Sequence, residues 1–299
     1  MAEREVTSDD QKRLAEFDQH RGLLFSIAYR MLGRVADAED MLQETFIRWL
    51  QSSAEDVRSA KAFLITIITR LSINQLQSAR VRREEYVGQW LPEPLVAPEA
   101  EAEADDTLSI AFLVLLERLN PTERAVFLLR EVFDYEYAEI AAALGITEAN
   151  CRQILRRARQ HVRAERPRFQ TTPQEHDDLL QQFHDAATSG NIDALAAILS
   201  ANVVLHTDGG GKAPALPNLV HGADNAARAI VGGMARLTPK DLVQQMMQIN
   251  GESAIVTYSH GKPFGVFTIR IQDGRIDAVY AITNPDKLSH LPGLPAAPI

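Results

Sequence analysis

The sequence predicts a multidomain protein in which two all-α domains, the second a helix-turn-helix, are followed by an α+β domain. Apolar residues recur at three- and four-residue spacing through residues 10–86 and again through residues 107–166, which is the period of amphipathic helices. A proline-rich, acidic stretch separates these two parts. After Pro173 two further helical stretches give way to alternating strands, so we expect a separate α+β domain there.

These patterns divide the 299 residues into five segments. We expect a helical domain at 1–86, a linker at 87–106, a helix-turn-helix domain at 107–168, an α+β domain at 173–290 and a frayed tail at 291–299. The prolines and like charges of the linker oppose helix formation, so an extended segment is predicted there. Between the last two predicted strands, Asp273-Gly274 is a strong hairpin signal.

The composition is that of an ordinary soluble protein, with 45% hydrophobic and 24% charged residues. The longest fully apolar run, 110–116, is far shorter than the roughly 20 residues that a membrane-spanning helix needs. Residues 1–13 lack the apolar core of a signal peptide. The single cysteine, Cys151, excludes an internal disulfide framework and a multi-cysteine zinc site. We therefore expect a cytoplasmic protein with no membrane contact, no metal and no cofactor.

The net charge of −9 argues against general nucleic-acid binding, but the charge is unevenly distributed. Residues 101–150 carry eleven acidic and three basic side chains. Residues 151–168 carry seven arginines and one acid. A basic block this local in an acidic protein predicts a specific anionic partner.

The basic block lies on a predicted helix over 148–163 that follows a short helix and a glycine turn at Gly145. One stripe of this helix is apolar and includes Cys151, which we expect to be buried. The opposite stripe carries the polar side chains Asn150, Arg152, Gln153, Arg156 and Arg157. Arginine and glutamine make bidentate contacts to guanine and adenine edges, so this face predicts a recognition helix in the major groove. The alternative is a solvated basic face of a bundle helix.

The first helical domain resembles the promoter-melting domain of bacterial sigma factors. The segment 37–46 is similar to the sigma helix that docks on the RNA polymerase clamp, and its Asp37, Asp40 and Glu44 share one face. The resemblance implies that core polymerase is bound by Asp37, Asp40, Gln43, Glu44 and Phe46. A solvated charged face is the alternative.

The resemblance extends to both promoter-reading surfaces. It implies that the −10 element is captured as single-stranded DNA by Thr66, Arg70, Asn74, Gln77, Arg80, Arg82 and Arg83. It likewise implies that the −35 element is read by Asn150, Arg152, Gln153, Arg156 and Arg157. The absence of a recognisable middle domain between the two helical domains indicates the extracytoplasmic-function class.

The C-terminal domain resembles the cone-shaped fold of SnoaL-like polyketide cyclases and nuclear transport factor relatives. A subgroup of extracytoplasmic-function sigma factors carries such an extension, and three segments match it. They are Trp90, Leu91, Pro92, Glu93 and Pro94 in the linker, Asp208, Gly209, Gly210, Gly211 and Lys212 in the extension, and Asn284, Pro285, Asp286, Lys287 and Leu288 near its end. Gln89 departs from the pattern, which has proline there.

These three segments suit an internal contact. Trp90 and Leu91 offer apolar area, and Glu93 could pair with Lys212 or Lys287. We expect the cone to hold the two sigma domains in a set geometry. The resemblance implies that it takes over the work of a separate anti-sigma partner.

Two other functions remain open at this stage. Asp208, His206, His221 and Tyr258 could do acid–base work, which would suit a SnoaL-type cyclase or isomerase fused to a DNA-binding region. A ligand-sensing helix-turn-helix regulator is the other alternative. The glycine run 209–212 lacks the spacing of a phosphate loop. We expect no catalysis, a chain that is monomeric when free, and as partners core polymerase, promoter DNA and a small apolar ligand in the cone.

Overall fold

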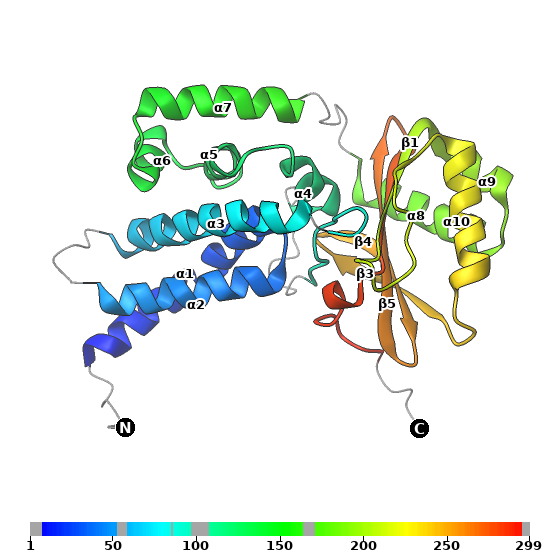
Figure 1. Ribbon diagram of the computed structural model, residues 1–299, viewed down its shortest axis with the longest axis horizontal. Helices are drawn as coiled ribbons and strands as arrows, with labels where there is room; N and C mark the ends of the chain where they lie inside the picture. Colours follow the sequence, from blue (N-terminus) through cyan, green and yellow to red (C-terminus); the bar gives the residue numbers. More distant parts are fainter. Residues whose placement is uncertain (1–7, 53–58, 85, 97–107, 164–170, 295–299) are drawn as a thin grey trace. The chain divides into compact units, whose positions relative to one another are not determined.

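The computed structural model describes residues 8–52, 59–84, 86–96, 108–163 and 171–294 (Figure 1). Contacts within the chain divide it into two compact units. The first unit comprises Met1–Arg82 and Leu116–Ala164, and the second comprises Arg83–Leu115 and Glu165–Ile299. No helix in the described part is both long and apolar enough to cross a membrane.

The first unit is all-α, as predicted. Its helices are α1 (Ser8–Leu32), α2 (Val35–Gln51), α3 (Ala60–Glu84), α5 (Pro121–Glu131), α6 (Tyr137–Leu144) and α7 (Glu148–Arg163). Gly33 ends α1 with a φ of 69°, a conformation that glycine adopts without steric cost, and its N–H donates to the Tyr29 carbonyl. Trp49 then joins α2 to α1, because its indole N–H donates to the Arg13 carbonyl at 2.9 Å.

The predicted helix-turn-helix is confirmed in α6 and α7. Gly145 closes α6 in the left-handed region, with a φ of 70°. The hydroxyl of Thr147 accepts from the Asn150 N–H and caps α7. The apolar stripe of α7 is buried, and it consists of Cys151, Ile154, Leu155, Ala158 and Val162.

The second unit contains a six-stranded sheet in the order β2-β1-β6-β5-β4-β3. The strands are β1 (Leu199–Asp208), β2 (Val220–His221), β3 (Val243–Ile249), β4 (Glu252–Ser259), β5 (Lys262–Gln272) and β6 (Arg275–Ile282). All neighbours pair antiparallel except β1 and β6, which pair parallel. The helices are α4 (Ile110–Leu116), α8 (Pro173–Thr188), α9 (Ile192–Ile198) and α10 (Ala223–Leu237), and η4 (Pro285–Lys287) is a short 3-10 turn.

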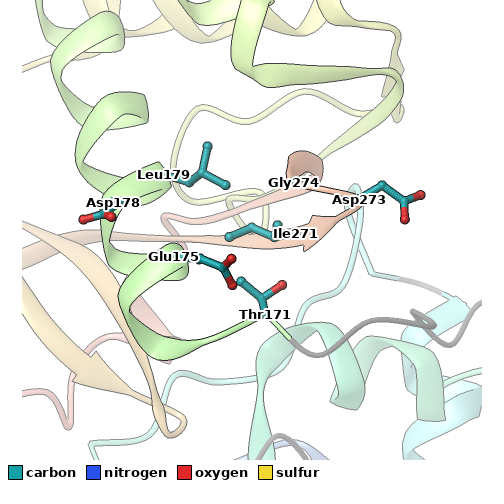
Figure 2. A pocket seen from close by; sticks show the side chains of 7 residues that line it. All are labelled: Thr171, Glu175, Asp178, Leu179, Ile271, Asp273 and Gly274. Atoms are coloured by element: carbon teal, nitrogen blue, oxygen red, sulfur yellow. The ribbon is translucent and has the colours of Figure 1, made fainter.

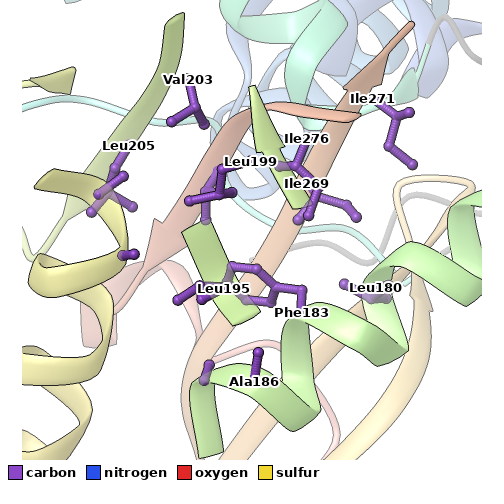
Figure 3. Packing of buried hydrophobic residues seen from close by; sticks show 14 of the residues in the cluster. Leu180, Phe183, Ala186, Leu195, Leu199, Val203, Leu205, Ile269, Ile271 and Ile276 are labelled. Atoms are coloured by element: carbon purple, nitrogen blue, oxygen red, sulfur yellow. The ribbon is translucent and has the colours of Figure 1, made fainter. Parts of the chain in front are cut away.

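Each face of the sheet is covered by a different set of elements. Helices α8, α9 and α10 cover one face, where Phe183 and Leu195 pack against Leu205 and Ile269 (Figure 3). The other face is covered by the linker and by α4, through Leu91 and Ile110. The linker residues 91–94 are buried on the cone, and Leu91 is part of its core.

The strands differ from the sequence prediction in two places. Strand β1 runs over ten residues, whereas the apolar run Val203–Leu205 marks only its centre. Strand β3 carries no recognisable alternation because glutamine and methionine fill most of its positions. Strands β4, β5 and β6 are the alternating strands predicted for this domain, and Asp273 and Gly274 adopt the positive φ values of the predicted hairpin turn.

The sheet contains one histidine whose titration couples to folding. His206 on β1 stacks on Tyr280 of β6, with ring centroids 4.9 Å apart. Burial, with the nearby charges of Arg270 and His221, lowers the pKa of His206 from 6.5 to about 4. The unfolded chain therefore binds this proton at higher pH than the folded chain. The resulting stability is complete above pH 6.5 and is lost as the pH falls towards 4.

We predict that His206→Phe flattens the acid side of the stability profile. Phenylalanine keeps the ring stack on Tyr280 and takes up no proton. In urea unfolding of the full chain, the wild type should lose on the order of 2–3 kcal/mol more than the variant between pH 7 and pH 4. His176, whose pKa burial also lowers, is present in both chains and cancels. An identical pH dependence in the two chains would contradict the assignment.

Candidate functional site

The exposed face of α7 carries the side chains expected to read DNA. Asn150, Arg152, Gln153, Arg156 and Arg157 are all exposed. The guanidinium of Arg152 donates to Glu148 at 2.7 Å and lies 4.9 Å from the centre of the Tyr137 ring. Arg156 has no ion pair with a described residue, so its charge is fully available to a ligand. Cys151 lies on the opposite, buried stripe, and burial raises the pKa of its thiol.

The expected −10 face lies on α3. Arg70, Asn74 and Gln77 are exposed, and Thr66 is half-buried. The predicted Arg80, Arg82 and Arg83 lie on the same helix, but their side chains are outside the described residues.

Within the first unit, α3 also contacts the helix-turn-helix. The Arg70 Nε–H donates to the Ala143 carbonyl at 2.7 Å. The Lys61 ammonium lies 5.6 Å from the centre of the Tyr135 ring. The buried Arg124 of α5 donates to the Arg30 carbonyl of α1 at 3.0 Å. These contacts join the helices of the two predicted domains within the first unit.

The expected polymerase face lies on α2. Asp40 and Gln43 are exposed, whereas Asp37 and Glu44 are half-buried. Glu44 accepts from Arg48 at 2.7 Å. Phe46 is half-buried, and its ring centroid lies 4.8 Å from that of Phe17.

Two apolar side chains extend the exposed face of α2, and sequence reasoning missed both of them as surface residues. Ile47 is 48% exposed and Leu50 is 39% exposed. They follow Asp40 and Gln43 at helical spacing, so all four share one face. The periodicity of α2 alone assigns Leu50 to the packed side.

The second unit contains a buried ion pair at the end of β1. The carboxylate of Asp208 is fully buried, and Lys287, which is 3% exposed, donates to it at 2.6 Å. Asp208 also accepts from the Leu91 N–H at 2.8 Å and from the Tyr86 hydroxyl at 2.6 Å. The Lys287 ammonium donates in addition to the Leu91 carbonyl. Both expected segments of the cone thus meet the linker segment at one point.

An aromatic and amide shell surrounds this pair. The Lys287 ammonium lies 4.3 Å from the centre of the Trp90 ring and 5.2 Å from that of Tyr86. The side-chain amide of Asn284 donates to the Tyr86 hydroxyl at 2.8 Å. Such contacts are worth most where the cation is desolvated, as Lys287 is here.

The glycines beside Asp208 are required because neighbouring groups lie too close to their backbone for a side chain to fit. A Cβ at Gly210 would lie 2.2 Å from the Asn284 amide nitrogen, and one at Gly209 would lie 2.1 Å from the Ala213 carbonyl oxygen. The Gly210 N–H donates to Asp208 at 3.1 Å. At the end of the run Lys212 forms an exposed ion pair with Asp286 at 2.6 Å. The run therefore forms a packed turn beside Asn284.

The structure gives Glu93 a partner that the sequence did not suggest. Lys212 is bound by Asp286 and Lys287 by Asp208. The buried Glu93 lies 3.0 Å from His290 Nδ1. The other ring nitrogen of His290 lies 2.6 Å from the Pro94 carbonyl oxygen. Sequence reasoning missed His290, which sits in a polar segment without a pattern.

The remaining linker residues are also packed on the cone. Leu91, Pro92 and Pro94 are buried, and Leu91 joins the apolar cluster of the sheet face. The side-chain amide of Gln89 is buried and has no hydrogen-bond partner among the described residues. A proline, which the family has at this position, would carry no such polar group. Pro285 and Leu288 frame η4, and Leu288 is buried in the same cluster as Leu91.

Two cavities lie in the second unit. An open cavity of about 500 Å³ lies between the start of α8 and the β5–β6 turn, lined by residues such as Glu175 and Asp273 (Figure 2). An apolar pocket of about 60 Å³ lies between α8, α10 and the sheet, where Phe183 and Phe267 line it.

The acid–base candidates do not converge on either cavity. His206, Asp208, His221 and Tyr258 are absent from both linings. The Tyr258 hydroxyl is bonded to the Met247 sulfur at 3.0 Å. The described residues also contain no group of three or more His, Cys, Asp or Glu side chains that could hold a metal ion.

Family models of known proteins match both helical parts of the chain. The family model for Sigma-70 region 2 matches residues 17–82, and that for Sigma-70, region 4 matches residues 109–162. The ECF RNA polymerase sigma factor SigJ of Mycobacterium tuberculosis is 35% identical over 296 residues, covering 93% of this chain and 94% of SigJ. The probable ECF RNA polymerase sigma factor SigI of the same species is 29% identical over 283 residues, covering 93% and 95%.

The solved structures include one that matches nearly the whole chain. The crystal structure of Mycobacterium tuberculosis extracytoplasmic function sigma factor SigJ has a TM-score of 0.75 at 33% sequence identity. The match covers 92% of this chain and 98% of that structure. The similarity therefore includes the C-terminal cone as well as the two helical regions.

We predict that Lys287→Ala destabilises the second unit by about 3–5 kcal/mol, because it leaves the Asp208 carboxylate buried without its counter-ion. Lys212→Ala is the matched control. It removes the same side chain from an exposed ion pair, where the expected loss is below about 1 kcal/mol. Chemical denaturation of the full chain measures both. Equal losses for the two variants would refute the assignment.

Proposed function

This chain belongs to the extracytoplasmic-function RNA polymerase sigma factors, and on that premise we propose that its cone is a built-in regulator acting through the linker. As a sigma factor it directs RNA polymerase to specific promoters and assists initiation. The observation that carries the proposal is the buried Asp208–Lys287 pair. Three further hydrogen bonds of this pair go to Leu91 and Tyr86, at the start of the linker.

The linker and the ion pair depend on one another. Lifting Leu91 away would remove one donor from Asp208 and one acceptor from Lys287, and both groups are buried. An unsatisfied buried polar group costs about 1–3 kcal/mol, and more when it is charged. The linker therefore has two favoured states, held on the cone or released with the pair hydrated. A regulator has to switch between two states. The two states of the linker therefore support the proposal that the cone does the work of a separate anti-sigma partner.

We assign polymerase docking to the exposed face of α2. Asp40 and Gln43 supply the polar contacts, and Ile47 and Leu50 extend them with apolar area. Phe46 is half-buried and packs on Phe17, so it positions the helix and leaves part of its side chain accessible. A partner surface with basic and apolar side chains complements this face.

We assign the −10 element to α3 and the −35 element to α7. Arg70 is bonded to Ala143 in this conformation, so single-stranded DNA has to displace that contact. This competition, together with the net charge of −9, supports weak binding of free DNA by the isolated chain. Polymerase then supplies the surface that separates the two regions.

The cone needs no catalytic step for this role. The expected acid–base groups line neither of the two cavities described above, and Asp208 is engaged by the linker. The apolar pocket of about 60 Å³ is smaller than the roughly 150 Å³ cavity that holds benzene, so the expected apolar ligand is restricted to a few heavy atoms. One chain carries both promoter-reading regions. It therefore acts as a monomer, and in the cytoplasm, where polymerase works.

We predict that Arg156→Ala and Arg157→Ala each weaken promoter recognition by about 1–3 kcal/mol if they read bases. Arg228→Ala on α10 removes an equally exposed arginine from the cone and should have no effect. Run-off transcription with purified core polymerase, on promoters altered one base pair at a time in the −35 element, gives the measurement. Full promoter output after removal of both arginines would show that α7 does not read the −35 element.

We predict that Trp90→Ala raises transcription by about three- to tenfold, because it removes a cation–π contact to buried Lys287 worth roughly 1–2 kcal/mol. Binding of −35 DNA should stay unchanged. Val87→Ala is the matched control, since Val87 lies in the same linker and is 68% exposed. Unchanged transcription in Trp90→Ala would sink the idea that the cone regulates through the linker.

A further inference from the structure

Asn250 occupies the tight turn between β3 and β4 and lies outside the three segments discussed so far. Its φ is 54° and that of Gly251 is 78°, which is the geometry of a two-residue hairpin turn. The residue is only 1% exposed, although turn residues normally face solvent. The dipeptide Asn-Gly is the sequence signal for this turn, but not for its burial.

The buried side chain of Asn250 bonds to two distant points of the chain. Its Oδ1 accepts from the Leu95 N–H at 2.9 Å, and its Nδ2–H donates to the Leu108 carbonyl at 3.0 Å. The Asn250 backbone N–H donates to the Leu95 carbonyl at 2.7 Å. All three residues belong to the second unit.

These bonds shorten the connection between the two regions. Leu95 and Leu108 are thirteen positions apart in the sequence. Fully extended, that length of chain spans about 45 Å. Because one amide group holds the Leu95 nitrogen and the Leu108 oxygen, these two atoms lie within about 8 Å of each other. While both bonds persist, the stretch from Leu95 to Leu108 therefore spans only a small part of its fully extended length.

We propose that Asn250 is a specificity-determining residue for the spacing between the two promoter elements. This rests on the proposed assignment of the −10 element to region 2 and the −35 element to region 4. Each added base pair moves the elements apart by about 3.4 Å and rotates one around the other by about 35°. While both bonds hold Leu95 close to Leu108, the linker spans a short distance and fits few spacer lengths. Without these bonds it can extend and fit more spacer lengths.

We call the two side-chain hydrogen bonds of Asn250, to Leu95 and to Leu108, the clasp. Two substitutions distinguish the effect of one bond from that of the other. Asn250→Gly keeps the left-handed backbone and removes both side-chain bonds. Asn250→Asp keeps the acceptor for Leu95 but loses the donor to Leu108. Asp273→Gly is the matched control, since Asp273 has a φ of 53° in the β5–β6 turn and bonds to neither end of the clasp.

Two measurements on the full chain test the proposal. Amide hydrogen exchange at Leu95 should become about tenfold faster in Asn250→Gly, and stay slow in Asn250→Asp and Asp273→Gly. Run-off transcription by the holoenzyme should use the best wild-type promoter with one to three base pairs added or removed between its elements. For each chain, the transcript yield on an altered spacer is divided by its yield on the unaltered promoter. This ratio should be about three- to tenfold higher in both Asn250 variants than in the wild type, and Asp273→Gly should match the wild type.

The outcomes distinguish the steps of the argument. Unchanged exchange at Leu95 in Asn250→Gly overturns the clasp. Faster exchange with an unchanged spacing profile overturns the role in promoter spacing. If the wild-type holoenzyme initiates on no template, the proposed function fails and the spacing role with it, while the exchange measurement still decides the clasp.

Discussion

The second unit depends on one buried charge pair, Asp208 with Lys287. Removing two ions from water costs several kcal/mol each, and their mutual attraction repays this only when the remaining donors and acceptors are also satisfied. Here the linker supplies those groups, through the Leu91 backbone and the Tyr86 hydroxyl. The buried Asp208 and Lys287 therefore have these hydrogen-bond partners only when the linker is bound to the cone. This explains why a segment that separates two helical regions in the sequence belongs to the core of a third domain.

Patterns confined to one element were predictable from the sequence. The two faces of α7 follow from helical period, and the Asp273 turn follows from local backbone preference. The apolar pair Trp90-Leu91 indicated that the linker is no solvated spacer, because neither side chain suits water. The three matching segments indicated which parts of the cone it meets.

Contacts between distant elements were not predictable. Glu93 pairs with His290, and no local rule prefers that histidine over Lys212 or Lys287. Strand β3 is missed because it lies at the sheet edge, where Gln and Met replace the usual alternation. The exposure of Leu50 was also missed, because the helical period fixes a face only to within one residue at its margins.

Helix α4 bears on how such a chain evolves. The region 4 family model begins at residue 109, so α4 is by descent part of the DNA-reading region. Its Ile110, Ala111 and Val114 nevertheless pack in the apolar cluster of the cone. A domain appended at a chain end usually shares only a boundary with its host and can be gained, lost or exchanged alone. Here a helix of the host completes the core of the appended domain, so substitutions on either side must suit the other. A cone transplanted from a relative would therefore need an α4 whose apolar side chains match its sheet.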